Sequence, residues 1–235
     1  IPIHLGNDHF TFNATADNDY GVHAAAAGNK PPLNSDIIQY QITIANAARV
    51  SFGKMKDSMD DKDKVLLNYL IDNKHTSPLE HVVFTFSVHC PLFVRGQWHR
   101  HRTWSYNEIS RRYTEIDIEF YTPPKLRKQA ETNRQASVAT DEFDNSGLRA
   151  KIQAHHASSL KFYEELLAAG VCREQARGVL PQDMMVTFWG TVDLSNLLHF
   201  LELRDSEQIP LLEEGGIEGF IRREVLPFLR NLHPC

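Results

Sequence analysis

The chain has 235 residues, of which 42% are hydrophobic and 23% charged, so it has the composition of a globular protein and enough length to bury a full core. Its formal net charge of -5 argues against a general polyanion binder, because non-specific binding of nucleic acid requires a broad basic face. We therefore expect one soluble domain whose positive charge is local.

The three cysteines, Cys90, Cys172 and Cys235, are an odd number, widely spaced and without a CxxC pair. They encode neither a disulfide framework nor a thiolate zinc site, and they favour the reducing cytoplasm. No stretch approaches the roughly 18 apolar residues of a membrane span. The first residues lack the basic and apolar sections of a signal peptide, and the missing initiator Met suggests a trimmed terminus.

In chain order, residues 1–34 have little periodicity and predict an irregular N-terminal arm. Residues 35–50 open with capping residues and predict a helix, and apolar residues at helical spacing predict a second helix over 62–71. Residues 81–90 alternate between apolar and polar side chains, which is typical of a half-buried strand.

Pro91 restarts a helix through Trp98 that has the RHR triplet at its end, and residues 103–113 then predict a loop. Residues 115–121 alternate again and predict a strand, whereas 125–150 are polar and weakly patterned and predict an excursion. Helical patterns follow over residues 151–169, 181–204 and 219–232.

The predicted strands cluster in the first half of the chain and the helices in the second. This order indicates an α+β fold, with a central, mainly antiparallel sheet flanked by helices and a helical C-terminal half. We expect residues 35–235 to form a single domain. The apolar stripe is expected to pack in its core: Met184, Met185, Phe188 and Trp189.

The segment from residue 100 to 112 carries the densest chemistry. It contains four arginines, one histidine and a single carboxylate, Glu108, interleaved with Trp104, Tyr106, Asn107 and Ser110. Arginine forks suit phosphate oxygens, so this segment predicts a bound nucleotide. Glu108 is expected to pair with an arginine and so to orient the remaining donors for a ligand.

Other chemistries remain open for the same segment. A nucleic-acid binding module could place the arginines on phosphates and stack Trp104 and Tyr106 on bases, and its affinity would fall steeply with salt. A nucleotide hydrolase would need paired acidic metal ligands that are absent nearby. Ser110 has no His or Lys base at a diagnostic spacing, so it is expected to hydrogen-bond phosphate. His75, Glu80, His81 and His199 do not form a compact ligand set, so no metal is expected.

The segment RHRTWSYNEIS, residues 100–110, resembles the RHR-seven-residues-Ser signature of the flavin-dependent thymidylate synthases and matches it at every fixed position. Further motifs of the same family are similar and occur in order along the chain: AARVSF at 47–52, HTSPLEH at 75–81, QWHR at 97–100, EQAR at 174–177 and LHFLELR at 198–204.

The resemblance implies reductive methylation of dUMP to dTMP, with 5,10-methylenetetrahydrofolate as the carbon donor and NADPH-reduced FAD as the hydride donor. It implies that dUMP is bound by Gln97, Trp98, His99, Arg100, Glu108, Ile109, Ser110, Arg111, Arg112, Arg177 and Arg204. It implies that FAD is bound by Ser51, His75, Ser77, Arg100, His101, Arg102, Asn107, Glu108, Asp193, Ser195 and His199. Asp193 and His199 stand where some relatives carry Asn.

C5 of neutral uracil is a poor nucleophile, and the conventional synthase activates it by adding a thiolate at C6. None of the three cysteines neighbours the arginine segment, so a thiolate route is not supported. We expect instead that a guanidinium against the uracil edge stabilises the N3-deprotonated ring, and Arg204 is the catalytic candidate. The family resemblance also implies a homotetramer with sites shared between subunits, and no membrane or nucleic-acid partner.

Overall fold

The computed structural model describes residues 23–26, 34–115, 118–123, 125–131, 137–138 and 146–204. Its centre is a four-stranded sheet in the order β1-β2-β6-β3, and every neighbouring pair is antiparallel. The strands are β1 (His23–Ala26), β2 (Val83–Pro91), β6 (Met185–Asp193) and β3 (Ser105–Glu108). A separate two-stranded ribbon pairs β4 (Lys128–Gln129) with β5 (Ser137–Val138).

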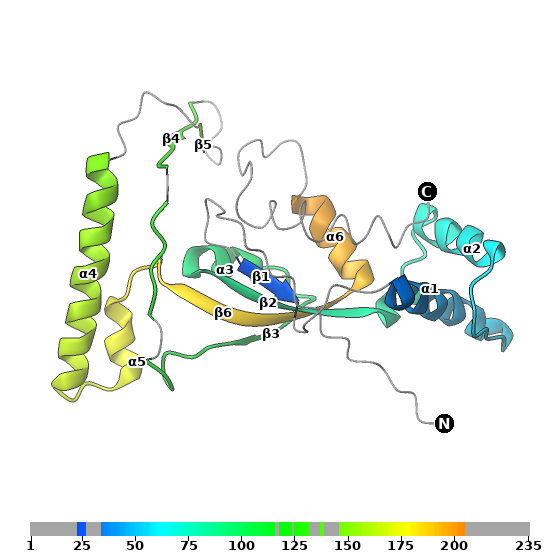
Figure 1. Ribbon diagram of the computed structural model, residues 1–235, viewed down its shortest axis with the longest axis horizontal. Coiled ribbons are helices and arrows are strands. Elements are labelled where there is room, and N and C mark those ends of the chain that lie inside the picture. Colours follow the sequence, from blue (N-terminus) through cyan, green and yellow to red (C-terminus); the bar gives the residue numbers. More distant parts are fainter. Residues whose placement is uncertain are drawn as a thin grey trace.

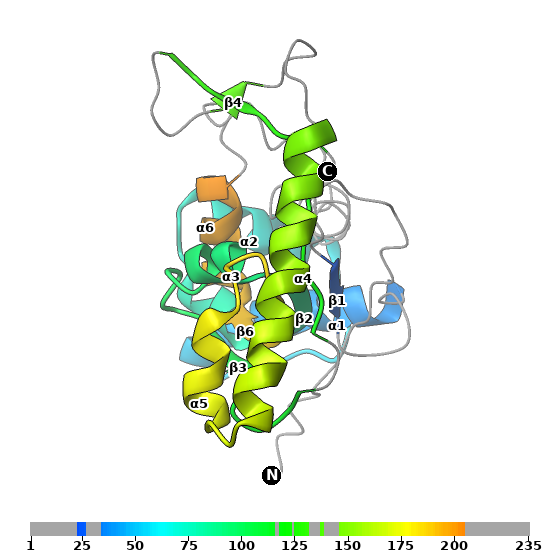
Figure 2. The same cartoon turned by 90° about the vertical axis from the view of Figure 1, so that its left-hand side faces the viewer.

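The helices surround this sheet on one face and at both ends (Figure 1). On one face lie α3 (Leu92–Trp98) and α6 (Leu194–Arg204). At one end stand α1 (Asn34–Arg49) and α2 (Asp61–Asp72), and at the other α4 (Ser146–Ala168) and α5 (Arg173–Ala176), which lie side by side in Figure 2. Short 3-10 turns complete the fold: η1 (Val50–Phe52), η2 (Ser77–His81) and η3 (Arg177–Val179).

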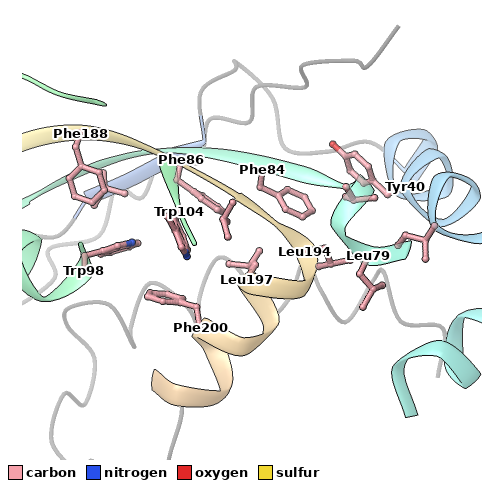
Figure 3. Close-up of a cluster of buried hydrophobic side chains, with 14 of the residues drawn as sticks. Tyr40, Leu79, Phe84, Phe86, Trp98, Trp104, Phe188, Leu194, Leu197 and Phe200 are labelled. Atoms are coloured by element: carbon pink, nitrogen blue, oxygen red, sulfur yellow. The ribbon is translucent and has the colours of Figure 1, made fainter. Parts of the chain in front are cut away.

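The core follows from the period-2 alternation of the two central strands. Phe84, Phe86 and Val88 of β2 are at most 5% exposed, and so are Phe188 and Val192 of β6. Figure 3 shows the phenylalanines of the two strands packing against Trp98 and Trp104 and against apolar residues of α6. A second buried cluster around Tyr163 joins α4 and η3 to the start of β6.

The α+β class, the antiparallel sheet and the helices over 35–50, 62–71, 91–98 and 151–169 are confirmed. The helix predicted over 181–204 is wrong in its first half, because residues 185–193 form the central strand β6. The C-terminal half is therefore not wholly helical. Within the described residues, no helix is long and apolar enough to cross a membrane.

Three smaller predictions also change. The loop predicted after Trp98 contains the short strand β3, whereas the strand predicted over 115–121 is reduced, in its described part, to one isolated bridge between Phe120 and Met184. Residues 23–26 of the predicted arm pair with β2, and α4 begins at Ser146 inside the predicted excursion. The helix predicted over 219–232 lies outside the described residues.

The predicted core stripe is confirmed except at one position. Met184, Met185 and Phe188 are at most 6% exposed, but Trp189 is 48% exposed. On a strand, side chains alternate between the two faces, so Trp189 points away from Phe188. It lies on the polar face of the sheet, opposite Ser87 and Asn107 in the register of the neighbouring strands.

Candidate active site

The first part of the site is the chain reversal at the end of α3. The backbone N–H groups of His99, Arg100 and His101 donate to the carbonyls of the last helical turn, so the RHR triplet forms a tight exit from the helix. The Tyr106 hydroxyl donates to the carbonyl oxygens of Trp98 at 3.1 Å and His101 at 2.9 Å. Burial raises the pKa of Tyr106 above its ordinary value, so the hydroxyl stays protonated as a donor. The turn is thus tied to β3 while Arg100 and Arg102 stay exposed.

Aromatic residues of the core also fix the RHR turn. Trp98 is completely buried, stacked on Phe200 at 5.4 Å between ring centroids and edge-on to Trp104 at 5.8 Å (Figure 3). Gly190 of β6 makes this possible, because a Cβ there would lie 3.1 Å from the Trp104 ring. The predicted dUMP contact of Trp98 could therefore come only from its backbone, since the indole ring belongs to the core.

The His99 ring lies beneath the turn. It stacks on Tyr106 at 4.0 Å and meets Phe188 edge-on at 5.0 Å. Burial, and then the nearby charge of Arg95, lower the pKa of His99 from its ordinary value, so the ring is neutral at physiological pH. The imidazole therefore acts as a packing group under the turn rather than as another cation.

Glu108, at the end of β3, is the centre of the second part. The Nη2 atom of Arg95 donates to Oε1 at 3.2 Å, and Nε lies 2.8 Å from Oε2 in an ion pair whose angle is not that of a hydrogen bond. Burial raises the pKa of Glu108, and the charges of Arg95 and Arg177 oppose that rise. Glu108 does pair with an arginine, but its partner is Arg95 of α3 and not an arginine of the 100–112 segment as expected.

The chain leaves β3 in a turn that starts at Ser110. The Ser110 Oγ accepts a hydrogen bond from the backbone N–H of Arg112 at 3.3 Å, and its carbonyl accepts from Tyr113 and Thr114. Arg112 lies 3.6 Å from Glu174 of α5, a loose and exposed ion pair. Arg111 is only 6% exposed, and its charge lowers the otherwise raised pKa of Tyr163 in α4.

Three exposed arginines near this turn have side chains that make no hydrogen bond or ion pair with any described residue: Arg100, Arg102 and Arg177. Arg177 begins η3, directly after α5, and its charge reaches Glu108. The structure therefore brings the end of α3, the end of β3 and η3 together, and leaves guanidinium groups available to an anion. Gln97 and Ile109 are also exposed beside them.

Six of the predicted FAD residues form a second group at the opposite end of the sheet, whereas the other five lie on the RHR turn and β3: Arg100, His101, Arg102, Asn107 and Glu108. Exposed His75 and Ser77 precede and begin η2, which contacts α1 and α6, and Ser51 is exposed in η1 after α1. Ser195 and His199 lie on α6. Asp193 caps that helix, because its carboxylate accepts from the backbone N–H of Asn196 at 2.9 Å and from its side-chain amide at 2.6 Å.

The donors at this end fit a flavin dinucleotide in their chemistry. The hydroxyls of Ser51 and Ser77 make no hydrogen bond within the described chain, and neither does the guanidinium of Arg102 at the RHR turn, so these groups remain available to phosphate oxygens or to the flavin ring edge. Asp193 fits less well, because both of its oxygens are engaged. Asn107 lies on the other face of β3 from Tyr106 and Glu108, so one chain does not bring it to the arginines.

Two described cysteines bear on the chemistry. Cys90 ends β2 and is completely buried, and burial, followed by the charge of Glu108, raises the pKa of its thiol to about 12. Cys172 is exposed before α5. No group of three or more His, Cys, Asp or Glu residues in the described ranges could hold a metal ion.

Sequence reasoning missed Arg95 and the structural roles of Tyr106 and Gly190. Arg95 is thirteen residues from Glu108, and the two side chains meet only because the chain reverses after α3 and continues through β3. The charge of Arg95 on a short, otherwise apolar helix was the available signal. Arg204 is the last residue of α6, and its predicted role is not tested by this geometry.

Comparison with known proteins identifies the class. The sequence model of one family, described as Thymidylate synthase complementing protein, matches residues 36–212. A flavin-dependent thymidylate synthase of Thermus thermophilus is 47% identical over 214 aligned residues, covering 80% of this chain and 78% of the relative. One from Thermosipho melanesiensis is 43% identical over 175 residues, covering 72% and 74%.

A solved structure agrees. The crystal structure of a UMP/dUMP methylase, PolB from Streptomyces cacaoi, bound with 5-Br UMP, superposes with a TM-score of 0.61 at 32% identity, covering 70% of this chain and 71% of that one. The chain belongs to the flavin-dependent thymidylate synthase family. The family resemblance, the enzyme class and the dependence on flavin are thereby confirmed.

Proposed function

We propose that the protein methylates C5 of dUMP to give dTMP, with 5,10-methylenetetrahydrofolate as carbon donor and NADPH as the source of reducing equivalents. The observation that carries this proposal is the set of unpaired, exposed arginines around the RHR turn and Glu108, in a chain of this family. When bound, FAD supplies the hydride that completes the methyl group.

The nucleotide phosphate is bound by the turn after β3. Arg100, Arg112 and Arg177 supply guanidinium donors, and the Ser110 hydroxyl, which accepts from the Arg112 N–H, can still donate its own proton to a phosphate oxygen. Gln97, His99 and Ile109 line the approach. These residues hold and orient the substrate, which is the larger part of what a protein contributes when a cofactor carries the chemistry.

Activation of the ring belongs to Arg204. A guanidinium placed against O4 and N3 of uracil stabilises the N3-deprotonated ring and shifts electron density toward C5. A thiolate at C6 is the alternative, and the buried Cys90 is unsuited to it, because a thiol with a pKa of about 12 is protonated at neutral pH. Arg204 is therefore the proposed catalytic residue.

The positions of the two groups support shared sites. The predicted FAD residues around η2 and the predicted dUMP residues around Ser110 lie at opposite ends of β6, whose nine residues span about 27 Å. Substrate and flavin must be adjacent for hydride transfer. A homotetramer in which neighbouring subunits contribute complementary ends satisfies this requirement.

Two measurements test the proposal. The FAD-loaded protein should be yellow, and its flavin absorbance should bleach on addition of NADPH; a preparation that cannot be loaded with FAD would contradict it. Arg204→Ala should keep the fold, measured by circular dichroism, and lose release of hydrogen from C5 of dUMP. Undiminished release would remove the activation role.

The same preparation tests the alternative of a nucleic-acid module. Binding to a phosphate backbone weakens steeply with ionic strength, whereas dUMP held in a closed site should depend on salt only weakly. The cytoplasmic location expected from the scattered cysteines stays a prediction.

A further inference from the structure

The Arg95–Glu108 ion pair lies directly beneath the proposed phosphate site. Arg95 comes from α3 and Glu108 from β3, and their side chains are 31% and 25% exposed. Both carboxylate oxygens are approached by the same guanidinium, at 3.2 Å and 2.8 Å. Arg95 is thus an arginine whose fork is committed to the protein, unlike Arg100, Arg102 and Arg177.

Glu108 has a second cation within electrostatic reach. Arg177 of η3 interacts with its charge but forms no ion pair with it. The other titratable groups that face Glu108 are the Cys90 thiol from β2 and, through Arg95, the neutral His99 ring. Since Cys90 is protonated and His99 neutral, Arg95 and Arg177 are the two positive charges that can compete for this carboxylate.

We propose that Arg95 is a positioning residue that occupies Glu108 and thereby keeps the Arg177 guanidinium free for the phosphate of dUMP. A carboxylate beside two arginines pairs with whichever is better placed, and Arg95 holds Glu108 by one hydrogen bond at 3.2 Å and one ion-pair contact at 2.8 Å. Without Arg95, Glu108 draws Arg177 inward and the substrate phosphate loses a donor. This inference rests on the proposed function, because it concerns the same site.

The test is the affinity of the FAD-loaded protein for dUMP, measured by isothermal titration calorimetry at several pH values. Arg95→Gln should weaken binding about tenfold at pH 8, the loss of one charge-assisted contact. Arg173→Gln is the matched control, because it removes the arginine of another Arg–Glu pair, in which Nε lies 2.6 Å from Glu115. It should change dUMP affinity less than about twofold.

The pH dependence of dUMP binding distinguishes a positioning role of Arg95 from a general disruption of the site by the substitution. Burial raises the pKa of Glu108 above its ordinary value, so its carboxylate takes up a proton as the pH is lowered. As the pH falls through this pKa, Glu108 becomes neutral and releases Arg177. The ratio of Arg95→Gln to wild-type dissociation constants should therefore shrink toward one as the pH is lowered from 8.

A double variant completes the test. In a Glu108→Gln background no carboxylate is present to pair with Arg177, so adding Arg95→Gln should reduce the affinity for dUMP little further. Arg95→Lys keeps the charge but not the planar guanidinium, so its dUMP affinity should lie between those of wild type and Arg95→Gln. It replaces Arg95→Gln in the test if that variant fails to fold. A pH-independent, additive loss, or an unchanged affinity, would overturn the inference. Wild-type protein that does not bind dUMP would instead overturn the proposed function.

Discussion

At the scale of single residues, the site depends on two kinds of polar side chain. Some fix the backbone of the RHR turn, and others are available to bind a ligand. Tyr106 is the clearest case, because one buried hydroxyl serves two carbonyls at the exit of α3. One carbonyl belongs to Trp98, before the RHR triplet, and the other to His101 within it, so the direction of Arg100 and Arg102 depends on the Tyr106 hydroxyl. The aromatic residues of this segment are thus part of the scaffold.

Tyr106→Phe should lower the free energy of unfolding by about 1–3 kcal/mol, because two partly buried carbonyls lose their donor. The Kd for dUMP should rise several-fold, since the turn that carries Arg100 loosens. Urea unfolding and calorimetric titration measure the two effects. Tyr113→Phe is the control. Tyr113 is 80% exposed, so loss of its hydroxyl should leave the free energy of unfolding unchanged. Equal effects of both substitutions would contradict this account.

Gly190→Ala tests the close packing of β6 on Trp104. The added Cβ would lie 3.1 and 3.3 Å from two atoms of the ring, and the indole is wedged among Phe86, Trp98 and Phe200. Thermal or urea unfolding should show a loss of about 1–3 kcal/mol. Gly96→Ala, in α3 with nothing within 4 Å of the new Cβ, should be neutral or stabilising by about 0.5–1 kcal/mol. An unchanged free energy of unfolding in Gly190→Ala would contradict this account, because it would mean that the Trp104 ring can move away from the added Cβ at little cost.

At the scale of elements, α1 and α2 are joined by a buried charge. Asp63 is completely buried, forms an ion pair with Arg49, and lies 3.2 Å from the Lys56 ammonium. It also forms a capping box with Asp60 at the start of α2. Asn46 exchanges two hydrogen bonds with the backbone of Lys56, so the loop that follows η1 and Ser51 is fixed at both sides.

Asp63→Asn should cost about 3 kcal/mol in unfolding free energy, because it leaves the Arg49 charge without its buried partner. The affinity for FAD should fall as well, since the Ser51 turn loses its anchor, whereas dUMP contacts at the other end of the sheet should change little. Flavin absorbance during titration with FAD measures this. Asp61→Asn, whose carboxylate is 97% exposed, should shift stability by less than about 0.5 kcal/mol. An equal loss in both variants would refute the special role of Asp63.

The limits of sequence prediction are also clearest in particular elements. The strand of residues 83–91 was predictable because its alternation places Phe84, Phe86 and Val88 on one buried face. Residues 185–193 alternate too, but Met184 and Phe188 are also spaced as on a helix, and only pairing with β2 and β3 on both sides decides for a strand. Four-residue β3 is too short for a periodic signal, and it forms because β6 offers an open edge.

The site divides in the same way. The RHR turn and Ser110 were predictable, because they form a contiguous motif whose chemistry depends on local spacing. The Arg95–Glu108 pair was not, because it depends on the antiparallel return of the chain. The burial of Trp98 and Arg111, among the predicted dUMP residues, likewise depends on α6 and α4, which come more than thirty residues later in the sequence.

At the scale of the whole molecule, the predicted ligands around η2 and those around Ser110 lie at opposite ends of β6, which supports the proposal that neighbouring subunits share a site. We expect light scattering coupled to size exclusion to give a mass about four times 26.9 kDa, as a homotetramer requires. Mixing an Arg177→Ala variant with a Ser51→Ala/Ser77→Ala variant should restore part of the activity, because some mixed sites contain only intact residues. An active monomer would contradict the shared site.

The central claim is that arginines, and no thiol of this chain, make the pyrimidine reactive. The most direct measurement is release of hydrogen from C5 of dUMP by the FAD-loaded Cys90→Ala/Cys172→Ala/Cys235→Ala variant with methylenetetrahydrofolate and NADPH present. We predict release within about tenfold of wild type, the small loss coming from the cavity left by the buried Cys90 side chain. A folded, flavin-loaded variant that releases no hydrogen would contradict the account.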